Sequence, residues 1–259
     1  MENEVQIMIQ QFVKHYSDFR DVQTKWREPL VAYADAKNEM FYNLKDVVSP
    51  SHALPVDILP EAKTVVTYFI PFDEGVVKSN IQGKECSEIW VKAYLETNQL
   101  ILDINIFIKN ELEKLGYKSN TIPASHLDPK KLISDWSHRH VAFIAGLGTL
   151  GLNNMLITDS GCCGRIGSFI TDLKIDPTER KNAENCLYKL RKTCKKCIVR
   201  CENKSLRIDN FDRHGCYKMC MCNAEFHSNI KADICGKCLV NVPCSTINPV
   251  KTKGGYIIL

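Results

Sequence analysis

The feature that most constrains this chain is a cysteine-rich segment, residues 186–244, which holds ten of the 13 cysteines. Within it, two Cys-x-x-Cys pairs are each followed closely by one more cysteine: Cys194, Cys197 and Cys201, and then Cys235, Cys238 and Cys244. Thiols at this density form disulfides, bind zinc or bind iron–sulfur clusters. A Cys-x-x-Cys pair with a third cysteine close behind is typical of a loop around an iron–sulfur cubane, so two such loops predict two clusters.

The cysteines divide into two ligand sets if the last cysteine of each run binds the other cluster, as in two-cluster ferredoxins. The first set is then Cys186, Cys194, Cys197 and Cys244, and the second set is Cys201, Cys216, Cys235 and Cys238. Cys220 or Cys222 could stand in for Cys216, and the sequence leaves that choice open. Zinc is the alternative ligand, although four-thiolate zinc sites seldom need a third cysteine so close. The remaining Cys86, Cys162 and Cys163 are interpreted as buried thiols that pack as small hydrophobic side chains.

The composition is that of a soluble globular protein, with 44% hydrophobic and 25% charged residues. The chain opens on acidic residues and has no long apolar run, so neither a signal peptide nor a membrane span is expected. We therefore expect a cytoplasmic protein whose cysteines are reduced and bind metal.

Positive charge is concentrated in the same part of the chain. The net charge is only +4, but residues 179–218 contain 12 Lys or Arg against five Asp or Glu. These cations either offset the negative charge of thiolate-bound clusters or form a docking surface for an acidic electron donor or a nucleic acid. We favour the first interpretation, since the segment lacks the interleaved aromatic residues on which single-stranded nucleic acid stacks.

The predicted fold is α+β, with a core over residues 1–178 and a cysteine-rich module over residues 179–259. Apolar residues at helical spacing predict helices over residues 4–20 and 87–115. Runs of β-branched and aromatic residues predict strands over residues 62–70 and 117–123. Residues 250–259 are expected to return to the core, because an exposed Ile-Ile-Leu end would favour aggregation.

A glycine-rich stretch, Gly146-x-Gly148-x-x-Gly151, matches the dinucleotide-binding pattern, with Asp172 about 20 residues further on. That pattern should follow a strand and open a helix, whereas residues 138–145 alternate poorly and a loop followed by a strand is expected after the glycines. The alternative is a glycine loop that lets the backbone approach a large flat ligand closely.

Four segments together resemble the epoxyqueuosine reductase family and its relatives, the reductive dehalogenases. They are Trp-Ser-His-Arg-His at 136–140, Ala-Gly-Leu-Gly-Thr-Leu-Gly-Leu at 145–152, Leu-Ile-Thr at 156–158 and Gly-Ser-Phe-Ile-Thr-Asp-Leu at 167–173. The cysteine-rich segment is similar to that family's double-cluster ferredoxin module. The resemblance implies a nitroreductase-like core, a C-terminal ferredoxin-like module with two 4Fe–4S clusters, and a cobalamin held base-off between them.

The resemblance also implies which residues bind the cobalamin. They are Ser137, His138, Arg139, His140, Gly146, Gly148 and Gly151. The glycines would form a wall free of side chains, and the polar residues would donate hydrogen bonds to corrinoid amides or phosphate. Structurally, the two histidines could instead be simple exposed turn residues.

The sequence departs from the tRNA-modifying members of the family in two ways. Their catalytic aspartate lies in an Asp-Ser-x-Pro context, whereas this chain has Leu132-Ile133-Ser134-Asp135, with the aspartate out of register. We also expect no counterpart of their C-terminal helical repeats, which help those enzymes hold tRNA. We therefore assign no catalytic residue and do not expect tRNA as a partner.

The resulting prediction is a cytoplasmic iron–sulfur, cobalamin-dependent reductase of a small molecule or a modified nucleoside. A ferredoxin or flavodoxin would be its redox donor, and no membrane partner is expected. Two alternatives remain open: an electron-transfer or corrinoid-reducing iron–sulfur protein without a substrate of its own, and a zinc-structured binding module.

Overall fold

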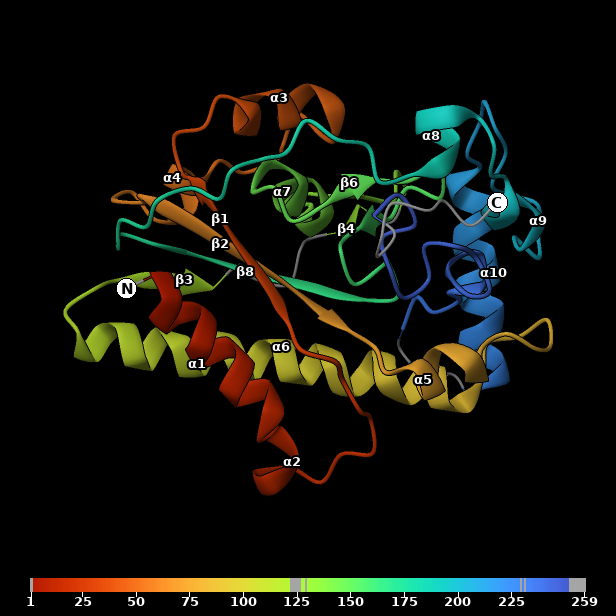
Figure 1. Ribbon diagram of the computed structural model, residues 1–259, viewed down its shortest axis with the longest axis horizontal. Helices are drawn as coiled ribbons and strands as arrows, with labels where there is room; N and C mark the ends of the chain where they lie inside the picture. Colours follow the sequence, from red (N-terminus) through yellow and green to blue (C-terminus); the bar gives the residue numbers. More distant parts are fainter. Residues whose placement is uncertain (1, 122–126, 129, 229, 231, 252–259) are drawn as a thin grey trace.

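A four-stranded antiparallel sheet in the order β1-β2-β8-β3 lies at the centre of the molecule (Figure 1). The computed structural model describes residues 2–121, 127–128, 130–228, 230 and 232–251. The strands are β1 (Leu30–Asp35), β2 (Thr64–Pro71), β8 (Gly164–Thr171) and β3 (Ser119–Thr121). All residues of β2 are buried, because the strand lies between β1 and β8 and both faces of the sheet are covered.

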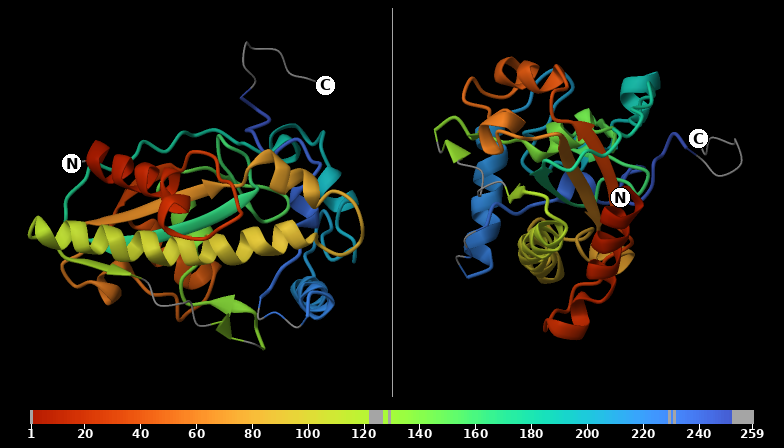
Figure 2. Two further views of the ribbon diagram at one scale, coloured as in Figure 1. Left: turned by 90° about the horizontal axis from the view of Figure 1, so that it is seen from below. Right: turned by 90° about the vertical axis from the view of Figure 1, so that its left-hand side faces the viewer.

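Alternate residues of β2 face two separate hydrophobic clusters, as the two-residue period of a strand requires. Val66 and Tyr68 face helices α1 (Glu2–Lys14) and α6 (Glu88–Lys114). Val65 and Phe69 face α3 (Met40–Val47) and α7 (His138–Ile144). The right-hand view of Figure 2 looks along α6 and shows α1 and α6 on one side of the sheet and α3 on the other.

The remaining elements are short, apart from α10. They are α2 (Tyr16–Phe19), α4 (Pro55–Ile58), α5 (Glu74–Ser79), β4 (Leu127–Asp128), β5 (Ile133–Ser134), β6 (Thr149–Leu150), β7 (Leu156–Ile157), α8 (Leu187–Arg191), α9 (Lys196–Val199), α10 (Arg213–Phe226) and the 3-10 turn η1 (Lys237–Leu239). None of the helices in the described ranges combines the length and the apolar character needed to cross a bilayer.

The long helix and the central strand lie where the sequence predicts them. The side chain of Ser87 caps α6 by accepting a hydrogen bond from the Trp90 N–H, and the helix ends just before Gly116. The predicted strand over residues 62–70 is β2, and β3 lies within the predicted strand over residues 117–123. The helical pattern over residues 4–20 is divided between α1 and α2.

Two elements that position the site were missed in the sequence. Residues 30–35 pair with β2 along their length and form β1. Residues 138–144 form α7, a short helix whose Val141, Ala142 and Ile144 are buried between α3 and the sheet. Gly146 ends α7, so the glycine-rich stretch follows a helix and leads into a strand, β6. This order is the reverse of a dinucleotide-binding turn.

The cysteine-rich module packs directly on the core. The backbone N–H groups of Cys162 and Cys163 donate to the carbonyl oxygens of Cys244 and Ser245 at 2.9 and 3.0 Å. Side chains from both parts then share one buried apolar cluster, which includes Phe72, Val76, Trp90, Ile234, Leu239 and Val240. The mixed α+β fold is confirmed, whereas the nitroreductase and ferredoxin descriptions and the boundary at residue 178 stay predictions.

The start of the C-terminal tail contacts the core. The Nζ atom of Lys251 lies 2.6 Å from the carboxylate of Asp159, in the loop between β7 and β8. Residues 252–259 lie outside the described residues, so the packing of the apolar end stays a prediction.

Lys237 fixes the second Cys-x-x-Cys loop to the core from inside. This side chain has no exposed surface, and its Nζ donates to the carbonyl oxygens of Asn80 and Gln82 at 3.0 and 2.8 Å. The side-chain amide of Asn80 in turn donates to the carbonyl of Cys235 at 3.0 Å. A buried lysine is found only where such partners satisfy it.

We expect Lys237→Met to destabilise the protein, because it leaves two buried carbonyl groups without a donor. Each such group costs about 1–3 kcal/mol, so the midpoint of thermal unfolding should fall by about 5 °C or more. Circular dichroism of anaerobically purified protein measures this shift. Lys196→Met is the matched control, since Lys196 occupies the same position in the first Cys-x-x-Cys loop but is exposed. Equal midpoints for the two variants would contradict the role given to Lys237.

Candidate functional site

The first predicted cysteine set surrounds one small cavity. Cys186, Cys194, Cys197 and Cys244 all line it, together with apolar residues such as Leu152 and Val242. Cys186 immediately precedes α8, and Cys197 lies in α9. Burial, followed by the nearby thiols of Cys244, Cys186 and Cys194, raises the pKa of Cys197 to about 12. Four thiols from three separate stretches of chain therefore line the same cavity.

The second predicted set surrounds a different, larger cavity of about 350 Å³. Its thiols are Cys201, Cys216, Cys235 and Cys238, with Cys220 as a fifth. Burial raises the pKa of Cys235 to about 11, and the Cys216 and Cys201 thiols contribute to that shift. Gly236 has a φ of +72°, and a Cβ atom there would lie 2.3 Å from the Trp90 ring, so this loop position requires glycine.

The structure narrows the choice of the α10 ligand. Cys216 and Cys220 lie one helical turn apart and their thiols are hydrogen-bonded, which lowers the pKa of Cys216. Cys222 is exposed and is not among the residues that line this cavity. Burial, followed by the nearby thiols of Cys235, Cys216 and Cys201, raises the pKa of Cys238. Cys216 and Cys220 both line the cavity, so the structure leaves these two as the candidates for the fourth member of the set.

Cys162 links the first cysteine set to a third cavity. Both Cys162 and Cys163 are buried, as expected, but the Cys162 Sγ lies 4.0 Å from the Cys244 Sγ. Cys162 also lines the large cavity described below. No cysteine spacing signals this contact, because it depends on how the module packs on the core.

In the part of the chain that the structure describes, no three His, Cys, Asp or Glu side chains form a group that could hold a single metal ion. Each cysteine set instead borders a cavity. Four thiols around a space are the donor set that an iron–sulfur cubane takes, so the residues fit that group.

The large cavity, of about 590 Å³, lies beside the second cysteine set. Ser137, His138, Arg139 and His140 line it, as do Phe69 and Ile166 of the sheet. Six residues line both this cavity and that of the second set: Arg139, Asn154, Met155, Gly164, Arg165 and Phe211. The two spaces therefore share a wall, and their volumes are typical of cofactor and small-molecule sites.

Three arginines give the large cavity a positive potential. They are Arg139, Arg165 and Arg213, and none of the described residues that line the cavity is Asp or Glu. Arg139 donates to the carbonyl of Asn154 at 2.9 Å, and burial and the nearby Arg213 lower its pKa. An anionic or amide-rich ligand would satisfy these donors. Arg165 and Arg213 escaped the sequence prediction because they come from β8 and the start of α10.

The two histidines are held in a hydrogen-bonded network. The Nδ1 atom of His138 lies 2.8 Å from the Ser168 hydroxyl, and the Nδ1 atom of His140 lies 2.7 Å from the Ser137 hydroxyl. Burial is the main reason that the pKa of each falls to about 4, and a neighbouring arginine adds to it. Both rings are therefore neutral at pH 7 and can accept a proton or a hydrogen bond.

Asp135 lies outside the large cavity, whereas Tyr94 lines the cavity of the second set. Asp135 accepts a hydrogen bond from the Ser51 hydroxyl at 2.5 Å and is not among the residues that line the large cavity. Tyr94 lines the cavity of the second set, where its hydroxyl donates to Asp233. The guanidinium carbon of Arg165 lies 4.0 Å from the centre of the Tyr94 ring, and burial raises the pKa of the phenol.

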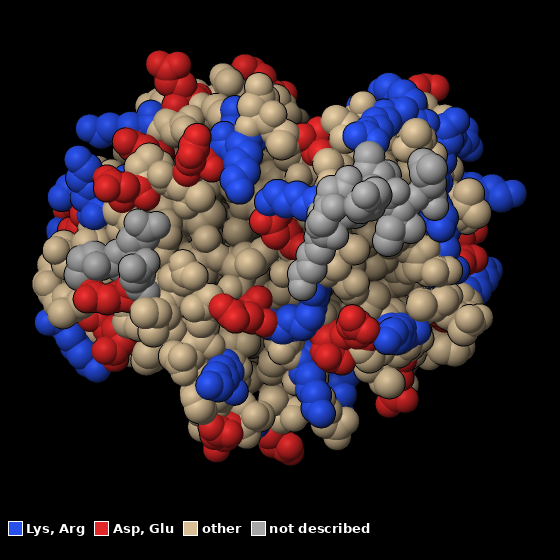
Figure 3. Space-filling model, in the orientation of Figure 1, with Lys and Arg blue, Asp and Glu red and all other residues tan. Residues whose placement is uncertain are grey.

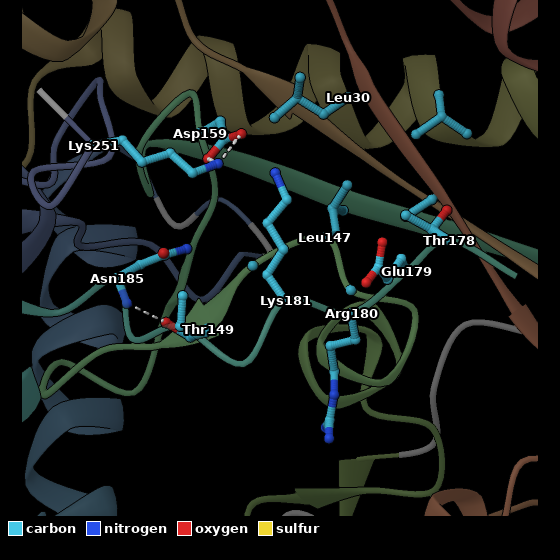
Figure 4. A pocket seen from close by; sticks show the side chains of 15 residues that line it. Leu30, Leu147, Thr149, Asp159, Thr178, Glu179, Arg180, Lys181, Asn185 and Lys251 are labelled. Carbon is cyan, nitrogen blue, oxygen red and sulfur yellow. Dashed lines mark hydrogen bonds and ion pairs between the residues drawn. The ribbon is translucent and has the colours of Figure 1, made fainter. Parts of the chain in front are cut away.

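The predicted glycines lie elsewhere. Gly146 and Gly148 line a separate cavity of about 220 Å³ together with Leu30, Thr149, Asp159 and Lys251. Figure 4 shows this cavity, with the Asp159–Lys251 pair on one side of it. A Cβ atom at Gly148 would lie 2.3 Å from the carbonyl oxygen of Ile157, so the turn itself requires this glycine. Gly151 packs against Ile157 in the same hairpin. The structure therefore does not bring the glycines to the cavity of Ser137–His140.

We expect the buried histidines to make stability depend on pH. Because the folded pKa of about 4 lies below the ordinary 6.5, the unfolded chain binds more protons between these values, and stability falls as pH drops through that window. His138→Gln should therefore lose less of its thermal midpoint between pH 7 and pH 5 than the parent does. His15→Gln, at an exposed position, is the control and should follow the parent. Parallel curves for all three proteins would contradict this account.

Comparison with known proteins finds solved structures with a similar fold. No protein-family model and no curated protein matches the chain. An epoxyqueuosine reductase from Streptococcus thermophilus is 13% identical, with a TM-score of 0.53 over 98% of this chain and 69% of its own. An epoxyqueuosine reductase bound to an epoxyqueuosine-modified tRNA stem loop is 14% identical, with a TM-score of 0.53 over 93% of this chain and 66% of its own.

A catabolic reductive dehalogenase in complex with 3-bromo-4-hydroxybenzoic acid is 17% identical, with a TM-score of 0.58 over 85% of this chain but only 30% of its own. The resemblance expected from the sequence is thus confirmed at the level of the fold: the chain is similar in structure to epoxyqueuosine reductases and to reductive dehalogenases.

Proposed function

We propose that the chain is an iron–sulfur reductase that works with a bound corrinoid. The observation that carries this proposal is the shared wall between the second cysteine set and the large cavity. A cluster held by the second set would lie across this shared wall from a ligand in the large cavity. The fold of the structural neighbours, which are named as reductases and dehalogenases, supports the same reading.

The cysteines would hold two 4Fe–4S clusters in the sets predicted from the sequence. The separate cavities support that division, with Cys216 or Cys220 as the α10 ligand of the second set. Each cluster would be held by loops with little core of their own, so its binding would contribute to folding.

The large cavity would bind the corrinoid through its polar rim. Arg139, Arg165 and Arg213 would donate hydrogen bonds to amide or phosphate oxygens, and neutral His138 would orient a donor or an acceptor. The bound group would supply a low-valent metal centre that is a strong nucleophile, while the protein supplies orientation and a site shielded from water.

Tyr94 lines the cavity of the second set next to Arg165, which lines both cavities, and it would hold a proton there. Its phenol stays protonated at neutral pH because burial raises the pKa, and Arg165 lies against its ring. The substrate, a small molecule or a modified nucleoside, would have to reach the wall that the two cavities share.

We expect each of Cys194, Cys197, Cys235 and Cys238 to be required for one cluster. Cys197→Ala should lower bound iron by about half, since the second set is intact. Anaerobic iron and sulfide analysis measures this loss, and Cys222→Ala, an exposed thiol of α10, is the control that should keep all its iron. Full iron content in Cys197→Ala would refute the assignment, and comparison of Cys216→Ala with Cys220→Ala would identify the α10 ligand.

Corrinoid binding tests the proposed function itself. The iron-replete protein, incubated with hydroxocobalamin and then desalted, should retain one corrinoid per chain with an altered visible spectrum. Ile166→Trp should lose it while keeping both clusters, because Ile166 lines the large cavity but not the cavity of the second cysteine set, and a larger ring would fill the space. Leu102→Trp, on the exposed face of α6, is the control. Failure of the iron-replete parent to retain corrinoid would favour an electron-transfer protein without a substrate site.

A further inference from the structure

The surface of helices α8 and α9 carries uncompensated positive charge. Residues 187–201 contain six Lys or Arg and no Asp or Glu. Five of these cations are exposed and define what we call the α8–α9 surface: Lys189, Arg191, Lys192, Lys195 and Lys196. Figure 3 shows Lys and Arg side chains gathered at the upper right of that face, over α8 and toward α9.

None of these five cations forms an ion pair with the described part of the chain. The closest partner of Lys192 is the ring of Tyr188, 4.9 Å from its Nζ. By contrast, lysines elsewhere pair with carboxylates, such as Lys78 with Glu74 and Lys118 with Glu61. An unpaired group of like charges raises the potential outside the surface and attracts an acidic partner.

Two apolar side chains lie among the cations. Val199 of α9 is 84% exposed and Leu190 of α8 is 43% exposed. Apolar side chains ringed by charged ones have the anatomy of a protein interface, with a hydrophobic centre and a polar rim.

This surface covers the first cysteine set. Cys194 lies between Lys192 and Lys195 in the chain and is partly exposed, and Cys197 lies in α9 two residues before Val199. The second set faces the large cavity instead. The two sets therefore have different neighbours: the outer surface for the first and the cofactor cavity for the second.

We propose that the α8–α9 surface docks an acidic one-electron carrier protein, which reduces the cluster held by the first cysteine set. This inference rests on the proposed function, because it requires that cluster. In each encounter one electron leaves the reduced carrier, which is oxidised, and enters the first cluster. No covalent bond forms or breaks. The electron then passes to the second cluster and to the cavity.

Stopped-flow absorbance with reduced flavodoxin, an acidic carrier, tests the docking. Lys189→Glu/Arg191→Glu reverses two charges on α8, and Val199→Ser removes the apolar centre on α9. The matched control is Lys63→Glu/Lys174→Glu, which makes the same change in net charge at exposed positions next to the opposite end of the sheet. Dithionite, which needs no docking surface, serves as the second reductant.

We expect both α8–α9 variants to bind full iron and to be reduced by dithionite at the parent rate. Flavodoxin should reduce both variants more slowly than the parent. For the charge reversal the rate should fall about tenfold or more, and this effect should shrink at high salt. The control should stay within about twofold of the parent.

Equal flavodoxin rates in the parent, the control and both variants, all with full iron, would overturn the docking surface and leave the proposed function standing. The same holds if dithionite reduces the parent and flavodoxin does not. A parent that binds no cluster under reconstitution would overturn the proposed function, and this inference with it.

Discussion

The arrangement of this molecule depends on the backbone contact between the loop before β8 and the end of the cysteine-rich module. Cys162 and Cys163 donate to the carbonyls of Cys244 and Ser245, and β8 begins at the next residue, Gly164. Pairing with β2 and β3 fixes the position of β8. The hydrogen bonds just before β8 therefore fix the position of the module relative to the sheet. Loops with little regular structure thereby acquire a defined position that their own packing could not give them.

This contact also explains why the cysteine sets and the large cavity lie next to one another. Cys244 belongs to the first set, Cys162 borders the large cavity, and their sulfur atoms are 4.0 Å apart. On the other side, Arg165 of β8 lines both the cavity of the second set and the large cavity. The vicinal cysteines therefore have a specific structural role: they join the cysteine-rich module to the segment that borders the large cavity.

The structure places the two predicted cysteine sets around separate cavities, and their role as cluster ligands stays a prediction. The large cavity could not be predicted, because its walls come from distant segments. Arg213 starts α10, Arg165 lies on β8, and His138 opens α7, and only tertiary packing brings them together. The glycine-rich stretch shows the opposite error. Its pattern is conspicuous, yet the structure uses Gly148 to let a hairpin turn pass close to Ile157. A glycine pattern indicates that the backbone passes close to a neighbour. The tertiary structure determines whether that neighbour is a ligand or another strand.

The cations of the module show why a single interpretation of a charged segment is insufficient. Lys237 and Arg200 point inward, where they donate to the carbonyls of Asn80, Gln82 and Ile81 and lie close to the second cysteine set. Such buried cations can offset the negative charge of a thiolate-bound cluster. The five cations of the α8–α9 surface point outward, where water already screens them and their effect on a buried cluster is small. Offsetting internal charge therefore accounts for the inner pair and not for the outer group, which is the group we propose as a docking surface.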